Sequence, residues 1–283
     1  MNDYSRKMLK VPTYNLLREQ DMGKLPVLDV RNLGIDFGGL TAVDSFNITI
    51  GPTEISGLIG PNGAGKTTIF NLLTGVYQPT RGAVLVKGVD IKGKSVSQVN
   101  RMGVARTFQN IRLFSKMTAL ENVKVGMHND IHCTFLDSML RLPNYYKAEK
   151  AAQERAMELL DFMGLRDVAD IPAGSLPYGI QRRLEIVRAL ATKPSVLLLD
   201  EPAAGMNPSE TADLMEQIRR IRDEFEIAIM LIEHDMNLVM GVCESIAVVN
   251  YGKIIAKGTP EQIQNNPAVI EAYLGKTMEG DES

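Results

Sequence analysis

Apolar positions along the chain follow two spacings, and the change between them divides the sequence. Short β-type runs separated by turn residues begin at Leu25 and include VLDVRNLGI, FNITI and residues 54–59 and 83–86. From about 119 to 184 this pattern fades. There, residues 149–165 place apolar side chains at the spacing of one helix face, namely Ala152, Ala156, Leu159, Leu160 and Met163. The pattern predicts a β-rich layer followed by a helical segment.

After Gln181 the pattern predicts alternating helices and strands. Residues 182–191 favour a helix with one apolar face (Leu184, Val187, Leu190), and residues 195–199 form a continuous apolar run typical of a parallel strand buried on both faces. Asn207 and Pro208 provide a cap and a first residue for another helix. Further strands are predicted at 227–232 and 246–249. We therefore expect an α/β core with a helical insertion and a β-rich layer in front of it.

Composition narrows the class of protein. The 283 residues include 31 Lys+Arg and 34 Asp+Glu, so a net charge of −3 does not favour nucleic acid as the main partner, although a local basic patch stays open. Two cysteines, Cys133 and Cys243, indicate a reducing compartment rather than a disulfide framework. Apolar runs fall short of the ~18–20 residues that span a bilayer, and the N-terminus has no signal-peptide core. These observations predict a soluble, cytoplasmic protein.

Residues 60–67, GPNGAGKT, form a phosphate-binding loop. The predicted strand 54–59 precedes it and an apolar helix follows it, which is the context that this motif requires. Glycines let successive backbone N–H groups surround a polyanion, and the start of the helix adds partial positive charge. Lys66 supplies a cation for the β- and γ-phosphates, and the Thr67 hydroxyl is placed to bind Mg²⁺.

A second acidic motif follows the apolar strand Leu197 to Leu199. Asp200 and Glu201 come at its carboxyl end, where open parallel sheets bind ligands. Asp200 is suited to hold Mg²⁺, and Glu201 is suited to polarise the attacking water. A kinase could use the same phosphate loop, so the two motifs alone leave the reaction open between hydrolysis and phosphoryl transfer.

Four further motifs decide between phosphate-loop families. They are Thr107-Phe108-Gln109, Leu176-Pro-Tyr-Gly179 before a helix, Ala203 to Asn207 after the acidic pair, and His234 after a strand. In this order they resemble the Q-loop, signature, D-loop and switch histidine of the nucleotide-binding domain of ATP-binding cassette (ABC) transporters, over about Leu25 to Gly275. The resemblance implies a P-loop NTPase (RecA-like) α/β core with an antiparallel β subdomain and an inserted α-helical subdomain at about 119–184. Residues 1–24 and 276–283 are then an N-terminal extension and a polar tail.

The resemblance also implies roles for individual residues. Glu201 and His234 are the expected catalytic residues, and Thr67, Gln109 and Asp200 are the expected Mg²⁺ ligands. The signature residues Tyr178 and Gly179 would face the ATP of a second subunit. ATP itself would contact an adenine-stacking ring and the loop, which assigns Phe37, Asn62, Gly63, Ala64, Gly65, Lys66, Thr67, Thr68 and Gln109.

The signature departs from the pattern L-S-G-G-Q that is general in this family. Pro177 replaces the serine, Tyr178 the first glycine and Ile180 the glutamine, whereas Gly179 is kept. Proline has neither a hydroxyl nor a backbone N–H with which to hold a γ-phosphate. We therefore expect weaker capping of the partner's ATP, with no effect on ATP held by this chain's own loop.

A narrower resemblance suggests the cargo. Residues 37–43 and 105–114, the segment PYGIQRRLEI and the C-terminal stretch 258–275 are similar to the ATP-binding subunits of bacterial branched-chain amino acid importers, the LivG type. This implies two membrane permeases, a second ATP-binding subunit and, indirectly, a substrate-binding protein as partners. The chain would then lie peripherally on the cytoplasmic face of the membrane.

Other functions stay open on the residues alone. An importer of urea or short amides would carry a similar subunit, because this subunit does not touch the cargo. A soluble ABC protein acting on nucleic acid usually has two cassettes, zinc-binding cysteines or long coiled coils. The two cysteines of this chain are too few for a zinc site made of cysteines alone. A GTPase or small-molecule kinase leaves Gln109 and His234 unexplained, and a module without catalysis leaves Lys66, Asp200, Glu201 and His234 unexplained.

Overall fold

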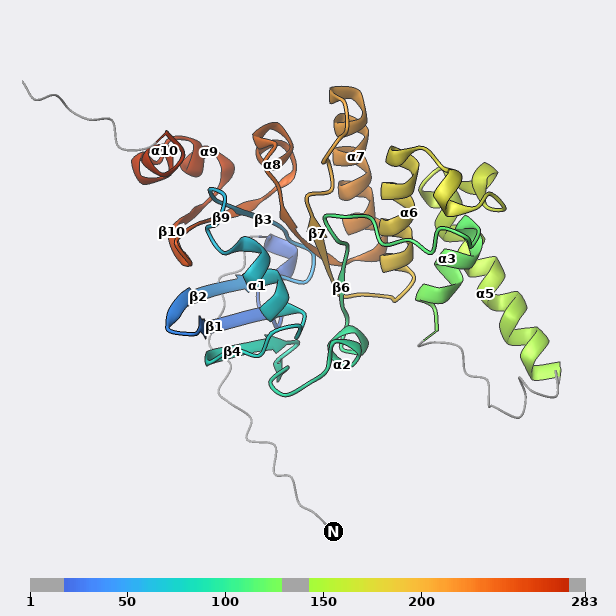
Figure 1. Cartoon of the computed structure of the whole chain (residues 1–283), viewed down its shortest axis with the longest axis horizontal. Helices are drawn as coiled ribbons and strands as arrows, with labels where there is room; N and C mark the ends of the chain where they lie inside the picture. Colours follow the sequence, from blue (N-terminus) through green and yellow to red (C-terminus); the bar gives the residue numbers. More distant parts are fainter. Residues whose placement is uncertain (1–17, 129–142, 275–283) are drawn as a thin grey trace, which may run out of the picture.

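The computed structural model describes residues 18–128 and 143–274. A six-stranded sheet in the order β10-β9-β3-β8-β7-β6 forms its centre (Figure 1). Its strands are parallel except for β10, which pairs antiparallel with β9 at one edge. They are β3 (Ile55–Ile59), β6 (Val104–Arg106), β7 (Val196–Asp200), β8 (Ala228–Ile232), β9 (Ser245–Asn250) and β10 (Lys253–Gly258).

A second, antiparallel sheet in the order β2-β1-β4-β5 forms the front layer. Its strands are β1 (Leu28–Phe37), β2 (Leu40–Ile50), β4 (Arg81–Val86) and β5 (Val89–Asp90). Helix α1 (Lys66–Leu73) joins the two sheets, because Ile69, Phe70 and Leu72 belong to one buried cluster with residues of both. The loop that precedes α1 is thereby fixed between two rigid layers.

Central strand β7 shows why a continuous apolar run was expected to be buried on both faces. Leu197 and Leu199 pack into the cluster on the helical side, whereas Val196 and Leu198 pack into the cluster shared with α1. The alternation follows from the two-residue period of a strand. Asp200 and Glu201 consequently come at the end of a strand that has no freedom to shift register.

The helical part lies at the opposite side of the molecule from β10 (Figure 1). It contains α3 (Ala119–Gly126), α5 (Pro143–Phe162), the short 3-10 turns η2 (Arg166–Val168) and η3 (Ala173–Ser175), and α6 (Tyr178–Leu190). The five apolar side chains predicted on one face of residues 149–165 are all buried. Helix α5 begins at Pro143, before the predicted start, and Gly164 with φ +67° follows its end.

Other helices complete the outer layers. Asn207 caps α7 (Pro208–Phe225) with Glu210 in a capping box, as the Asn-Pro pair predicts. Helices α2 (Val96–Arg101), α8 (Met236–Val242), α9 (Pro260–Gln264) and α10 (Pro267–Leu274), and strands β6 and β10, were not predicted by the apolar pattern. No helix within residues 18–128 and 143–274 has the length and apolar character to cross a membrane.

The last residues of the N-terminal extension carry structure that their mixed pattern did not predict. Residues Glu19–Asp21 form the turn η1, and Asp21 is fully buried. Its carboxylate accepts hydrogen bonds from the backbone N–H and the hydroxyl of Thr53, at 3.0 and 3.1 Å. This contact fastens residues 18–24 to the turn before β3. Cys133 lies outside the described residues, whereas Cys243 is a buried free thiol whose pKa burial raises.

Candidate nucleotide-binding and hydrolysis site

The phosphate loop runs from the end of β3 to the first turn of α1. Gly60 has φ +156°, and a Cβ there would lie 2.0 Å from the carbonyl oxygen of Val249, so glycine is required for the close approach to β9. Gly65 has φ +101° and stands at the cap position of α1. Asn62 and Gly63 at the tip are exposed, Ala64 is buried, and Thr67 is exposed beside the half-buried Thr68. The tip of the loop is therefore exposed, as is Thr67 in the first turn of α1.

Lys66 is held within this loop. Its Nζ donates hydrogen bonds to the carbonyl oxygens of Gly60 and Pro61, at 2.6 and 2.9 Å. Burial lowers the pKa of its ammonium, and the nearby carboxylates of Glu201 and Asp200 act in the opposite direction. The structure thus brings the predicted cation close to both predicted carboxylates, although they are separated by more than 130 positions in the sequence.

Asp200 stands at the carboxyl end of β7 with only 4% of its surface exposed. One carboxylate oxygen accepts a hydrogen bond from Arg106 Nη2 at 2.6 Å, and Arg106 Nη1 donates to Asn71 Oδ1 at 2.7 Å. The guanidinium lies near the rings of Phe70 and Phe108, at 5.4 and 5.5 Å from their centroids. Arg106 was not predicted as a site residue, and it neutralises the predicted metal ligand.

Glu201 is the meeting point of three motifs. Gln109 Nε2 donates to one of its carboxylate oxygens at 2.8 Å, and His234 Nε2 donates to the other at 2.9 Å. Its backbone has φ +49°, a conformation that non-glycine residues rarely adopt, and its N–H donates to the carbonyl of Ile232 at 2.9 Å. Backbone strain of this kind concentrates at functional sites. The structure therefore joins the two predicted catalytic residues with the predicted Q-loop glutamine.

A buried glutamate beside the histidine also escaped sequence analysis. Glu233 is 4% exposed, and its carboxylate accepts hydrogen bonds from the backbone N–H groups of Ala203, at 2.7 Å, and His234, at 2.9 Å. Burial raises the pKa of Glu233, and those backbone donors oppose the rise. The contact ties the segment after Glu201 to the segment that carries the histidine.

The predicted adenine ring lies at the end of β1. Phe37 is 44% exposed, and its ring meets that of Tyr77 edge to face, with centroids 5.3 Å apart. Tyr77 was not predicted. An exposed ring that a second ring holds at an angle is suited to stack on a planar base.

The signature residues lie apart from this cluster. Tyr178 and Gly179 start α6, whereas the phosphate loop starts α1, and the two helices are separated by the central sheet (Figure 1). The Tyr178 ring packs against Gly205, where an added Cβ would lie 3.3 Å from Cε1 of the tyrosine. Helix α6 and the helix that carries Lys66 pack into different buried clusters, whereas Arg182 of α6 reaches the backbone carbonyl of Glu201 at 3.0 Å.

The comparisons with known proteins agree with this arrangement. A family model described as "ABC transporter" matches residues 43–204, and another described as "Branched-chain amino acid ATP-binding cassette transporter" matches residues 253–278. The chain belongs to the ABC transporter family. It is an ATPase of this family, and the predicted P-loop α/β fold is confirmed.

Individual relatives cover most of the chain. The "High-affinity branched-chain amino acid transport ATP-binding protein LivG" of Escherichia coli (strain K12) is 50% identical over 251 residues, or 89% of this chain and 98% of that protein. BraF of Pseudomonas aeruginosa, with the same description, is 48% identical over the same shares. The ADP conformation of MJ1267, an ATP-binding cassette of an ABC transporter, superimposes with a TM-score of 0.77 at 30% identity, covering 89% of this chain and 99% of that one.

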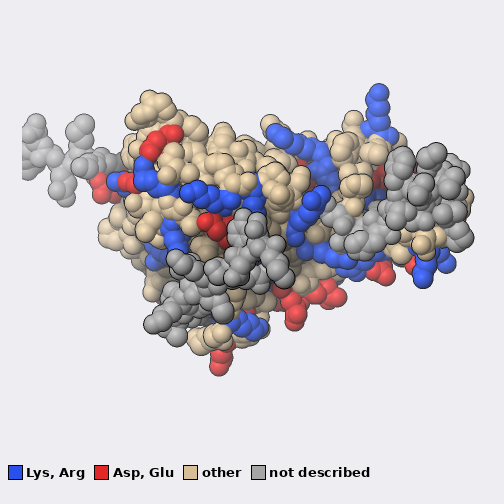
Figure 2. All heavy atoms as spheres, turned by 90° about the horizontal axis from the view of Figure 1, so that it is seen from below, with Lys and Arg blue, Asp and Glu red and all other residues tan. Residues whose placement is uncertain are grey.

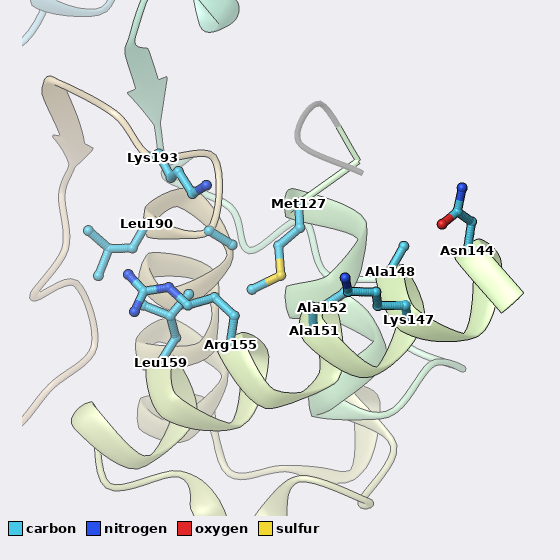
Figure 3. A pocket seen from close by; sticks show the side chains of 11 residues that line it. Met127, Asn144, Lys147, Ala148, Ala151, Ala152, Arg155, Leu159, Leu190 and Lys193 are labelled. Carbon is cyan, nitrogen blue, oxygen red and sulfur yellow. The ribbon is translucent and has the colours of Figure 1, made fainter. Parts of the chain in front are cut away.

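A separate hollow lies in the helical part (Figure 3). Its volume is about 400 Å³, and side chains of α5 and of the end of α6 surround it, with Met127 pointing inwards. It is lined by Met127, Asn144, Lys147, Ala148, Ala151, Ala152, Arg155, Leu159, Leu190, Ala191 and Lys193. Since it contains none of the predicted site residues, it is not part of the nucleotide site.

Proposed function

We propose that this chain is the ATP-hydrolysing subunit of an importer that brings branched-chain amino acids across the cytoplasmic membrane. The observation that carries the hydrolytic role is the carboxylate of Glu201, which Gln109 and His234 hold from both sides beside Lys66. The cargo is supported by the printed descriptions of the relatives, at 50% and 48% identity over nearly their whole length. Urea or a short amide is the alternative cargo.

We assign the nucleotide to the surface between Phe37 and the phosphate loop. In this assignment the backbone N–H groups of Asn62, Gly63, Ala64 and Gly65 and the side chains of Lys66, Thr67 and Thr68 hold the phosphates, and Phe37 stacks on adenine. Glu201 accepts the proton of the attacking water, and His234 holds the γ-phosphate. Gln109 moves from its present partner Glu201 towards the phosphate side when nucleotide binds.

The residues present fit a magnesium ion. A protein holds Mg²⁺ through one or two carboxylates and the substrate phosphates rather than through a closed protein cage. Asp200 supplies a carboxylate on a rigid strand end, Thr67 a hydroxyl in the first turn of α1, and Gln109 an amide. Among the described residues there is no group of three His, Cys, Asp or Glu side chains arranged for a metal, as this mode of binding allows. The ion would neutralise phosphate charge during hydrolysis.

The same proposal gives the partners. ATP hydrolysis drives conformational change in two permeases. This chain pairs with a second ATP-binding subunit, and its Tyr178 and Gly179 cover the nucleotide of that subunit. A substrate-binding protein is an indirect partner. This places the chain peripherally on the cytoplasmic face of the membrane. Figure 2 shows Lys and Arg side chains that follow one another across one face, with Asp and Glu side chains beside them and towards its lower edge. Nucleic acid is not among the partners that we propose.

One experiment tests the proposal and separates the cargoes. Tagged chain is purified from membranes, its copurified proteins are identified, and the complex is reconstituted in vesicles loaded with ATP. We expect two hydrophobic permeases in the preparation, and uptake of leucine, isoleucine or valine that requires ATP. Uptake of urea or acetamide instead would replace the cargo but keep the importer. ATPase activity without any copurified permease would contradict the transport role.

A further inference from the structure

Arg182 in α6 is a fully buried arginine, with 0% of its side chain exposed. Its Nη1 donates to the carbonyl oxygen of Phe108 at 2.6 Å, and its Nη2 donates to the carbonyl oxygens of Gln109 at 2.8 Å and Glu201 at 3.0 Å. One guanidinium thus contacts the backbone of two loops that are 92 residues apart in the sequence.

The charge of this arginine is matched locally. Glu185, one turn further along α6 and also buried, accepts a hydrogen bond from Arg182 Nη1 at 3.1 Å. The second oxygen of Glu185 accepts from the backbone N–H of Arg112 at 3.2 Å, so the carboxylate also holds the far end of the same loop. A buried ion pair is costly to desolvate and is a poor source of stability. Stability therefore does not by itself explain the ion pair between Arg182 and Glu185.

The three carbonyl groups belong to the segments that carry Gln109 and Glu201. Two of them belong to residues whose side chains meet, since Gln109 Nε2 reaches Glu201 Oε2 at 2.8 Å, and Phe108 directly precedes Gln109. Arg182 therefore fixes the distance between the backbones of Gln109 and Glu201 through their carbonyl groups. The side-chain amide of Gln109 and the carboxylate of Glu201 meet separately. Glu201 also has the rare φ of +49°, which needs surrounding contacts to persist.

We propose that Arg182 is a positioning residue for hydrolysis. Its guanidinium holds the backbones of Gln109 and Glu201 at a fixed position relative to α6, the helix that begins at the signature. Arg182 lies four residues after Tyr178 on α6, so a shift of the signature end of this helix would move the backbone that carries the Glu201 carboxylate. The inference rests on the role of Glu201 given under the proposed function.

The substitution Arg182→Lys tests this role, because lysine keeps the charge but lacks the planar fork that reaches several carbonyls at once. Misplacement of a reacting group by about 1 Å can cost 10²-fold in rate. We expect kcat of the assembled transporter to fall about 10–100-fold, with KM and the affinity for ATP changed less than about 3-fold, because Lys66 and its loop are untouched. Amide hydrogen exchange should accelerate in peptides that cover residues 107–112 and 200–205.

Arg219→Lys is the control for an arginine that bonds a backbone carbonyl outside the site, although its side chain is 40% exposed. Arg219 also donates to one backbone carbonyl, that of Gly241, and also pairs with a glutamate three residues earlier, but on α7 and away from the site. It should leave kcat and the exchange of both segments unchanged. If Arg182→Lys is poorly folded, Glu185→Gln takes its place, since it removes the countercharge and one of the two acceptor oxygens while leaving the three carbonyl contacts in reach; its kcat should fall below that of the wild type, with the affinity for ATP unchanged.

Two results would overturn the inference. Unchanged kcat in a folded Arg182→Lys protein would show that the carbonyl contacts do not position the site. An equal loss of ATP affinity and kcat would show that Arg182 supports nucleotide binding instead. Glu201→Gln, measured alongside, separates this failure from failure of the proposed function: if Glu201→Gln keeps the wild-type rate, then the assignment of Glu201 fails first.

Discussion

At the scale of single residues, the site depends on a few positive and negative side chains that lie close together. Lys66 donates to backbone carbonyls and lies near two carboxylates, and Asp200 forms an ion pair with Arg106. Such a cluster keeps its carboxylates apart from solvent without leaving an unpaired charge. A bound polyphosphate and its metal ion would replace these internal partners.

Lys66→Ala is expected to abolish tight ATP binding. The substitution removes the one cation that the phosphate loop contributes, and it leaves Glu201 and Asp200 near the phosphates without compensation. Equilibrium binding of a fluorescent ATP analogue to the purified variant measures the effect. Affinity close to that of the wild-type chain would remove the basis for assigning residues 60–67 to the phosphates.

Phe37→Ala should weaken ATP and GTP by similar factors. The ring offers stacking to any purine, and its edge contact with Tyr77 holds it in place without contributing a base-reading hydrogen bond. Competition binding with ATP, GTP and inorganic triphosphate tests this. Triphosphate binding should not change; an equal loss for triphosphate would show that Phe37 is not beside the base.

At the scale of elements, α6 is the helix that carries both the signature residues and a buried ion pair. It starts at Tyr178 after Pro177, which has φ −54° at the cap position and offers no side-chain cap. It then contributes Arg182 and Glu185 to the buried frame below Gln109 and Glu201. The same helix therefore joins the signature residues to the loops that carry Gln109 and Glu201.

Pro177→Ser should preserve or raise ATP hydrolysis in the assembled complex. Serine is a favoured cap residue, and it restores both a hydroxyl and an N–H to the signature. Phosphate release by the reconstituted transporter is the measurement, with the unchanged complex as reference. A severe loss would show instead that the fixed backbone angle of proline is required at the start of α6.

The sequence predicted some elements better than others, for physical reasons. Strands β7 and β8 are buried on both faces, so each reads as a continuous apolar run, and α5 and α7 are long enough to show a full helical period. Strand β6 spans three residues and the edge strand β10 is partly exposed, so neither leaves a clear pattern. Short helices such as α8 and α9 likewise lack the length for a period to appear.

The residues of the candidate site likewise divide into those that the sequence predicted and those that it did not. Lys66, Asp200 and Glu201 were predictable because their motifs are local in the sequence. Arg106, Arg182 and Glu233 were not, because a buried charged side chain looks like any surface charge until its distant partners are known. Arg182 left no distinct signal in the sequence, because α6 also contains the charged residues Arg183, Glu185 and Arg188.

At the scale of the whole molecule, the separation of α1 and α6 determines how the chain can work. Helices α1 and α6, which begin at the phosphate loop and at the signature, pack on opposite faces of the central sheet, so the proposed function assigns the signature to the nucleotide of a second subunit (Figure 1). Two ATP-binding subunits that close head to tail would complete two sites. In the proposed function, nucleotide favours the closed pair and hydrolysis releases it, which would give the permeases two states to respond to.

Glu201→Gln tests the central claim, that Glu201 activates the water. Glutamine keeps the shape of the side chain and its contacts with Gln109 and His234 in reach, but it removes the negative charge. Hydrolysis should therefore fall about 10²–10⁴-fold, the usual worth of a general base, while ATP still binds. Asp200→Asn is the control, and it should instead weaken the binding of ATP that depends on Mg²⁺.

The most direct measurement is phosphate release by the Glu201→Gln complex, followed by size-exclusion chromatography of the same sample with ATP and Mg²⁺. We predict loss of phosphate release together with accumulation of a closed pair of ATP-binding subunits that retains unhydrolysed ATP. Phosphate release at the wild-type rate from an intact Glu201→Gln complex would contradict the account, because the carboxylate held by Gln109 and His234 would then not be the base.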